Sequence, residues 1–281
     1  MFNSTCSSRA AHHRGPRQKV IAYSIYGDFS RTEIVGKYLE PFRETIKDIP
    51  IIYPGWIVRI YYNMTSEDVE NTNVIWKTLD LGSHVDLCNV TEITRKHNLG
   101  NLFAMTWRWL PLLDDMVDML MSRDSDSRII PREKAAVREW LASDRIFHIM
   151  RDHPYHCIPI LGGMWGVKVS QARSILGRDS FTKIFSTKHS HKYNYDQFLL
   201  KTHIWPMAKT NMVNICGLLN NTISMAHDSY CCRHFPSSQP FPTQRKDGLF
   251  VGGRDLPEEE LQFPCPKRCR PKNRTSDWNY C

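Results

Sequence analysis

Short apolar runs alternate with amphipathic segments through the first half of the chain. Runs rich in branched and aromatic residues that end at glycine or polar residues predict strands. Segments whose apolar residues recur three or four positions apart predict helices. We expect strands at residues 20–27, 56–62, 85–90, 116–121 and 145–150. We expect helices at residues 32–46, 69–79, 101–113 and 131–142.

This alternation predicts the fold class and the domain boundaries. Strands that alternate with helices favour an α/β fold with a mostly parallel central sheet flanked by helices. The 281 residues suit one large domain of this kind, which we expect to span residues 19–230. Residues 1–18 are polar and basic and predict a disordered leader. Residues 231–281 are rich in Cys, Pro and basic residues and predict an extended, disulfide-stapled extension.

The strand expected before Arg123 ends in two aspartates, Asp124 and Asp126, with Arg128 beyond them. Carboxylates one residue apart that leave a strand can converge on one hard divalent cation such as Mg²⁺ or Mn²⁺. Such a cation bridges the phosphates of a nucleotide and stabilises a departing diphosphate. The alternative is an ordinary solvated loop, because Asp and Ser are also common in turns. Tight ion pairs of Arg123 and Arg128 with the aspartates would exclude the metal.

Four further segments carry residue types that suit a phosphate- and sugar-binding site. Residues 160–166 place Gly162, Gly163 and a third glycine around Trp165, where glycines admit a ligand close to the backbone and Trp offers a flat face to a sugar. A tight turn with a core Trp is the alternative. The other segments contain Asp196-Gln197 at an expected helix start, His227 next to an Asp, and Asp152 after an expected strand.

The charge balance favours a polyanionic partner. There are 37 basic and 29 acidic residues, a net charge of +8. A nucleotide diphosphate or an acidic glycan would suit this charge, as would a generally basic surface without a specific partner. No basic helix interleaved with aromatic residues and no nucleic-acid-binding motif is present, so we expect no nucleic-acid partner.

Cysteines and glycosylation motifs indicate the secretory pathway. Five Asn-x-Ser/Thr motifs begin at Asn3, Asn63, Asn89, Asn220 and Asn273, and most of the nine cysteines fall late in the chain. We therefore expect a secreted protein or one in the secretory lumen, namely the Golgi, whose targeting segment is missing from this sequence. No apolar run is long enough to span a membrane. The late cysteines 265, 269 and 281 with His234 have poor spacing for zinc, so disulfides are the favoured interpretation.

Taken in order, these segments resemble a glycosyltransferase of the GT-A fold over residues 19–230. The resemblance rests on VIAYSIYG, Asp124-Ser125-Asp126, GGMWG, Asp196-Gln197 and His227. It implies a Rossmann-like domain in which Asp124, Asp126 and His227 hold Mn²⁺ or Mg²⁺ on the diphosphate of a nucleotide-sugar donor. Asp196 and Gln197 would lie beside the anomeric carbon of the sugar. The expected donor and acceptor contacts are Tyr23, Arg123, Arg128, Gly162, Gly163 and Trp165.

The resulting hypothesis is transfer of a sugar from a nucleotide-sugar donor to a glycan or glycoprotein acceptor, with an acidic glycan among the candidates. Either Asp152 or Asp196 would take the proton of the acceptor hydroxyl. One alternative is a lectin-like module on a degenerate transferase fold. Another is a phosphatase whose first aspartate is the nucleophile, although that motif usually opens a domain. Metal-dependent hydrolysis of a nucleotide-sugar and formation of a phospho-aspartate would separate the three.

Overall fold

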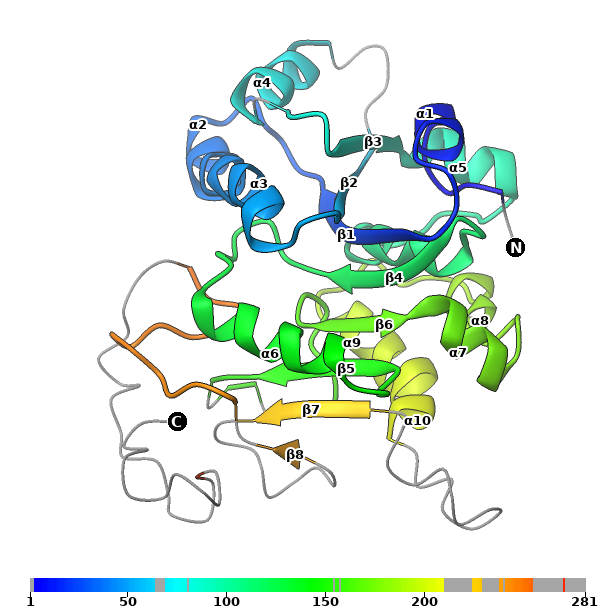
Figure 1. Cartoon of the computed structure of the whole chain (residues 1–281). Helices are drawn as coiled ribbons and strands as arrows, with labels where there is room; N and C mark the ends of the chain where they lie inside the picture. Colours follow the sequence, from blue (N-terminus) through cyan, green and yellow to red (C-terminus); the bar gives the residue numbers. More distant parts are fainter. Residues whose placement is uncertain are drawn as a thin grey trace.

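The computed structural model describes residues 3–63, 69–79, 81–153, 155–156, 158–209, 224–228, 238–239, 241–254 and 270. Its centre is one twisted sheet in the order β3-β2-β1-β4-β6-β5-β7-β8 (Figure 1). The strands are β1 (Gln18–Ile25), β2 (Ile57–Tyr62), β3 (Val85–Asn89), β4 (Val117–Ser122), β5 (Phe147–Arg151), β6 (Trp165–Lys168), β7 (Ser224–Asp228) and β8 (Ser238–Gln239).

Only β6 runs against its neighbours, and the other described strand pairs are parallel. The predicted α/β fold with a mostly parallel sheet is therefore confirmed, and the strands expected near residues 20, 56, 116 and 145 share this sheet. The described helices are α1 (Ser8–His12), α2 (Thr32–Ile34), η1 (Val35–Leu39), α3 (Glu40–Ile52), α4 (Val69–Leu79), α5 (Val90–His97), η2 (Ala104–Leu113), α6 (Pro131–Ala142), α7 (Val169–Leu176), α8 (Thr182–Ser186), α9 (Tyr195–Leu199), η3 (Leu200–Ile204) and α10 (Trp205–Ala208).

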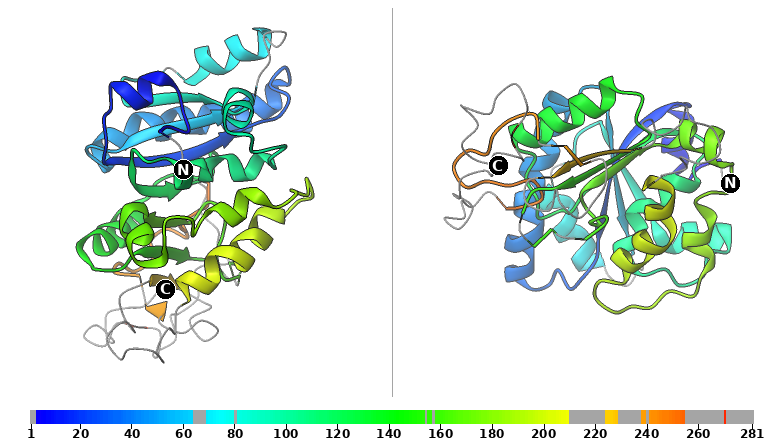
Figure 2. Two further views of the ribbon diagram at one scale, coloured as in Figure 1. Left: turned by 90° about the vertical axis from the view of Figure 1, so that its right-hand side faces the viewer. Right: turned by 90° about the horizontal axis from the view of Figure 1, so that it is seen from below.

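Helices cover both faces of the sheet (Figure 2). Because successive side chains of a strand point to opposite faces, β1 contributes to two separate cores. Val20 and Ala22 pack with η2, α5 and α7 to α10 on one face. Ile21 and Tyr23 pack with α3, α4 and α6 on the other. The apolar runs of the sequence are continuous rather than alternating because these strands are buried on both sides.

The segment expected to be a helix at residues 101–113 is a 3₁₀-helix, η2, that begins at Ala104. Two amide groups that an α-helix would use are not available to it. Pro111 has no N–H, and the N–H of Arg108 donates to Ser24 Oγ at 3.0 Å. The helix expected at residues 32–46 extends further than predicted, through the π-helical turn η1 to Ile52 at the end of α3.

Residues 3–17 differ from the disordered leader that their composition predicts. Cys6 forms a disulfide with Cys88 of β3, and Thr5 and Ala10 are fully buried. The backbone N–H and the hydroxyl of Thr5 both donate hydrogen bonds to the carboxylate of Asp114. This carboxylate also forms an ion pair with the buried Arg59 at 2.6 Å. A few anchoring contacts therefore order this polar segment.

No helix in the described part of the chain is both long enough and apolar enough to cross a bilayer.

Replacing Cys6 with Ser should lower the free energy of unfolding by about 2–5 kcal/mol, because the disulfide closes a loop of 82 residues in the unfolded chain. Urea unfolding of the oxidised wild type and of the variant measures the difference. Both proteins are also unfolded under reducing conditions as the control, where the difference between them should disappear. Equal stability of the oxidised wild type and the variant would contradict the disulfide.

Candidate functional site

The candidate site lies where β1 and β4 separate at their carboxyl ends. The two strands pair up to Ala22 and Ser122, after which β1 continues beside β2 alone. The chain leaves β1 toward β2 on one side, whereas β4 lies on the other side, so this is a topological switch point of the sheet. Open α/β sheets bind ligands in the crevice that such a reversal creates. Asp124 follows the end of β4 by two residues.

Asp124 is held by a buried arginine from η2. Its side chain is 36% exposed, and one carboxylate oxygen accepts a hydrogen bond from Nη1 of Arg108. The carbonyl of Asp124 accepts from the N–H of Ser127 at 3.2 Å, which closes the turn after β4. Asp124 therefore has a fixed position with part of its carboxylate open to solvent.

Arg108 joins two carboxylates from distant segments. Its side chain is 4% exposed, and Nη2 lies 3.6 Å from Oδ2 of Asp196 on α9. Burial lowers the pKa of the Arg108 guanidinium, but the carboxylates of Asp124 and Asp196 raise it by more. The guanidinium thus stays charged inside the protein, between Asp124 and Asp196.

Asp196 is almost fully buried, at 1% exposure. Neither carboxylate oxygen has a hydrogen-bond partner of ordinary geometry among the described residues. Burial raises the pKa of Asp196, which the charge of Arg108 and the nearby backbone N–H groups of Gln197 and Asp196 only partly offset. A carboxylate whose pKa is raised by burial is a stronger base than an exposed carboxylate. With open acceptor positions, it can take the proton of a hydroxyl group. Next to it, Gln197 is half-buried, and its amide lies 3.4 Å from Oδ1 of Asn194.

The glycine-rich loop before β6 closes over this group. Ser122 Oγ accepts from the indole of Trp109 at 3.1 Å and donates to the carbonyl of Gly162 at 2.6 Å. A Cβ on Gly162 would overlap Asp196 and Arg108, and one on Gly163 would overlap Asp124. Only glycine lets the loop approach this closely. The fold thus brings together Asp124, Asp196, Gly162 and Gly163 from three segments.

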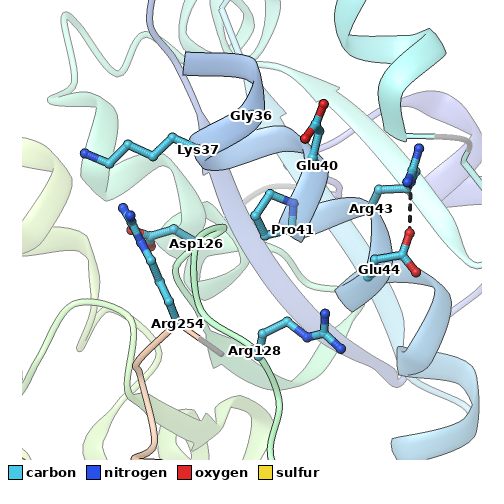
Figure 3. Close-up of a pocket in the computed structure, with 9 residues that line it drawn as sticks. All are labelled: Gly36, Lys37, Glu40, Pro41, Arg43, Glu44, Asp126, Arg128 and Arg254. Carbon is cyan, nitrogen blue, oxygen red and sulfur yellow. Dashed lines mark hydrogen bonds and ion pairs between the residues drawn. The ribbon is translucent and has the colours of Figure 1, made fainter. Parts of the chain in front are cut away.

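Asp126 and Arg128 face a different side of the loop. Asp126 pairs with Arg254 at 3.3 Å, and Arg128 lies 3.8 Å from Asp48 of α3. Both line a pocket of about 490 Å³ between η1, α3 and the segment that ends at Arg254 (Figure 3). The arginines that contact the two aspartates are therefore Arg108 and Arg254, not the sequence neighbours Arg123 and Arg128.

Three of the expected donor or acceptor contacts lie in the core. Arg123 is buried and pairs with Glu133 at 2.6 Å. Tyr23 is fully buried against Phe42, and burial raises the pKa of its hydroxyl. Trp165 is fully buried in β6, at 6.2 Å from Trp109 between ring centroids. Their apolar surroundings or internal ion pairs leave these side chains no exposed surface for a ligand.

Asp152 is enclosed by two arginines. Its carboxylate pairs with Arg132 of α6 at 2.9 Å and with Arg245 at 2.9 Å, and it accepts from the N–H of Val251 at 3.0 Å. The side chain is fully buried. A base needs an acceptor position for the substrate hydroxyl, and these three partners occupy the carboxylate of Asp152, which instead fastens residues 245–251 to the end of β5.

His227 lies in β7, which points to the same edge of the sheet as β4 (Figure 1). It pairs with Met150 of β5, so three strand spacings, about 14 Å, separate its backbone from β4. The side chain of His227 lies outside the described residues. Among the described residues, no group of three His, Cys, Asp or Glu side chains is arranged to hold a metal ion.

The sequence did not predict two residues that lie at this site, Arg108 and Tyr26. Arg108 stands alone in the apolar segment AMTWRWLPLL, and a charge in such a segment signals a buried ion pair. Tyr26 follows β1, is 47% exposed and lies edge-on to Trp107 at 6.0 Å. Partial burial raises the pKa of Tyr26, and the nearby Asp124 and Asp196 raise it further.

The chain has no match to a protein-family model, and no curated protein matches its sequence. Among solved structures it is similar to 4-diphosphocytidyl-2C-methyl-D-erythritol synthase from Anaerococcus prevotii DSM 20548. The TM-score is 0.38 at 9% identity, over 66% of this chain and 84% of that one.

Replacing Asp152 with Asn should lower the free energy of unfolding by about 3–5 kcal/mol, because it leaves buried guanidinium groups without their counter-charge. Asp126→Asn is the matched control, and loss of its exposed ion pair should cost about 1 kcal/mol or less. Urea unfolding of both variants measures the difference. A similar, small decrease in the free energy of unfolding of both variants would contradict the anchoring role of Asp152.

Proposed function

We propose that this protein is a nucleotide-sugar-dependent glycosyltransferase that transfers a sugar to a glycan or glycoprotein acceptor. The observation that carries the proposal is the group formed by Asp124, Arg108 and Asp196 under the Gly162-Gly163 loop, at the switch point of an α/β sheet. This group combines an exposed carboxylate for a cation with a buried carboxylate for a hydroxyl or a developing positive charge.

Asp124 and Asp126 suit a divalent cation in their chemistry. Both carboxylates are about one-third exposed and offer hard oxygen ligands. Mg²⁺ is usually held by one or two carboxylates together with substrate phosphates, so the carboxylate of Asp124 alone is enough. Mn²⁺ or Mg²⁺, when bound there, would stabilise the charge of the leaving diphosphate. Asp126, which pairs with Arg254, and His227 stay predicted further ligands.

Arg108 positions the site and contributes charge. By pairing with Asp124 it fixes the direction of that carboxylate, and its positive charge lies beside the place where the diphosphate leaves. A fixed charge in a water-poor site stabilises a developing anion without reorganisation. The loop glycines, Gly162 and Gly163, leave room beside the backbone for the side chains of Asp124, Arg108 and Asp196.

Asp196 is our candidate for the carboxylate at the reacting carbon, with Gln197 beside it. The transfer passes through an oxocarbenium-like state that an adjacent carboxylate stabilises. Asp196 has open acceptor positions and a raised pKa, whereas Asp152 is saturated by arginines. We therefore assign the acceptor proton to Asp196. Tyr26, exposed at the end of β1, replaces Trp165 as the aromatic surface for the base or sugar of the donor.

Glycan binding without transfer is the second candidate. The pocket beside Asp126 offers both cationic and anionic side chains to a hydroxylated ligand. A lectin-like protein would use this pocket and would not hydrolyse a nucleotide-sugar. Slow metal-dependent hydrolysis of the donor in the absence of acceptor supports the transferase, and its absence supports the lectin.

Replacing Asp124 with Asn should abolish metal-dependent donor binding while the protein stays folded, because Asp196 still gives the buried Arg108 a counter-charge. A thermal-shift screen of UDP-, GDP- and CMP-sugars with and without Mn²⁺ measures this, because a ligand at 100 times its Kd stabilises the native state by about 2.7 kcal/mol. Asp179→Asn, an exposed carboxylate between α7 and α8, is the matched control and should keep the shift. A donor shift that survives in Asp124→Asn would remove this residue from the site.

Replacing Asp196 with Asn should lower kcat by roughly 10²–10⁴-fold, the usual contribution of general acid–base catalysis. In the wild type the rate should rise with pH as Asp196 loses its proton, at a pH above the ordinary pKa of 3.8 because burial raises that pKa. Asn cannot titrate, so this limb of the pH–rate profile should vanish. An unchanged limb in the variant would assign it to another group.

The secretory compartment stays a prediction, supported by the Cys6–Cys88 disulfide, which persists in oxidising compartments. Asn63 is exposed, whereas Asn89 is half-buried and caps α5 through the N–H of Thr91. We therefore expect glycan at Asn63 before Asn89. After expression in secretory cells, glycosidase treatment should change the gel mobility of the wild type and of Asn89→Gln. It should not change the mobility of Asn63→Gln. Wild-type protein without any shift would contradict this compartment.

A further inference from the structure

The pocket beside Asp126 is lined by charges of both signs. Its cations are Lys37, Arg43, Arg128 and Arg254, and its carboxylates are Glu40, Glu44 and Asp126 (Figure 3). Gly36 and Pro41 complete the described lining. The volume of about 490 Å³ lies in the range of small-molecule sites. Cations bind an acidic group and carboxylates accept hydrogen bonds from hydroxyls, so this lining fits a ligand that has both.

The cations are available to a ligand. Arg43 pairs with Glu44 at 3.0 Å, but both side chains are more than 40% exposed. Arg128 lies 3.8 Å from an exposed Asp48. Exposed ion pairs contribute about 0–1 kcal/mol, so a ligand can replace them at little cost. Lys37 has no carboxylate partner within the described residues, and its ammonium lies 5.1 Å from the ring centre of Tyr38.

The pocket is held in shape by the segment that ends at Arg254. The carbonyl of Gly252 accepts from Ser127 Oγ at 3.0 Å, and that of Gly253 accepts from the N–H of Arg128 at 3.2 Å. The guanidinium of Arg254 lies 6.0 Å from the ring centre of Tyr38. In Figure 3, Lys37 and Arg254 extend to one side of the pocket and Arg43 and Arg128 to the other. The cations are thus spread around the ligand space.

The pocket adjoins the proposed donor site. Asp126 lines it, and Asp124, two residues earlier, faces Arg108 and Gly163. The Cα atoms of residues two apart lie at most about 7 Å from each other. A sugar in the pocket would therefore be next to the donor diphosphate without occupying its place.

We propose that this pocket binds an acidic sugar unit, a ring that carries a carboxylate, sulfate or phosphate group, of the acceptor glycan. Lys37 and Arg254, which extend to the same side of the pocket and both lie near the ring of Tyr38, bind the acid, and Glu40 accepts hydrogen bonds from ring hydroxyls. The assignment to the acceptor rests on the proposed transferase function. The binding of an acidic sugar rests on the pocket alone.

The test is equilibrium binding of a disaccharide that contains glucuronic acid, compared with the same disaccharide with glucose in its place. Calorimetry at constant ionic strength, without nucleotide or metal, measures both. We expect binding of the acidic disaccharide and none of the neutral one at equal concentration. Sulfated and phosphorylated analogues identify which acid binds most tightly.

The double variant Lys37→Gln, Arg254→Gln should weaken binding of the acidic disaccharide by roughly tenfold or more, because hydrogen bonds to charged groups are the strong ones. The matched control is Lys134→Gln, Arg138→Gln on α6, which removes two exposed charges outside the pocket and should change Kd less than twofold. Circular dichroism checks that both variants are folded.

Equal affinity for the acidic and neutral disaccharides would overturn the proposal. An equal loss of affinity for the acidic disaccharide in the two double variants would also overturn it. Displacement of the acidic disaccharide by a nucleoside diphosphate in simple competition would also overturn it, because the pocket would then belong to the donor. Binding that persists in a protein without nucleotide-sugar hydrolysis would leave the acidic-sugar site standing and reject the transferase.

Discussion

The site depends on one buried charge. The guanidinium of Arg108 lies among apolar residues of η2, and a charge there is stable only when opposite charges reach it. Asp124, after β4, and Asp196, on α9, supply them. Because the chain must bring these two segments to one point, the loop after β4, the glycine-rich loop and α9 are fixed relative to one another. The geometry of the candidate site follows from this requirement.

Buried ion pairs between an arginine and a carboxylate also occur elsewhere around the sheet. Arg123 pairs with Glu133, Arg59 with Asp114, and both Arg132 and Arg245 pair with Asp152. Each pair is buried and joins two different structural segments, from 10 to 93 residues apart in the sequence. Some of the basic residues that suggested a polyanionic partner are therefore neutralised by carboxylates inside the protein. The charge that remains for ligands gathers where arginines are exposed, as in the pocket of Figure 3.

The two aspartates of the Asp-x-Asp motif have different surroundings. Asp124 faces the buried group of Arg108 and Asp196, and Asp126 faces the exposed pocket and Arg254. This arrangement places the pocket directly beside the proposed donor site.

The sequence alone determined the α/β class, the main strands and the position of Asp124 after a central strand, because hydrophobic runs and turn residues are local signals. It also selected Gly162, Gly163 and Asp196, whose residue types suit close approach and acid–base chemistry. Tertiary structure decided the rest. Arg108 became part of the site, and Trp165, Tyr23 and Arg123 became core, because burial and pairing depend on segments far apart in sequence. The ordered N-terminal residues likewise depend on Cys88 and Asp114, which no local pattern links to them.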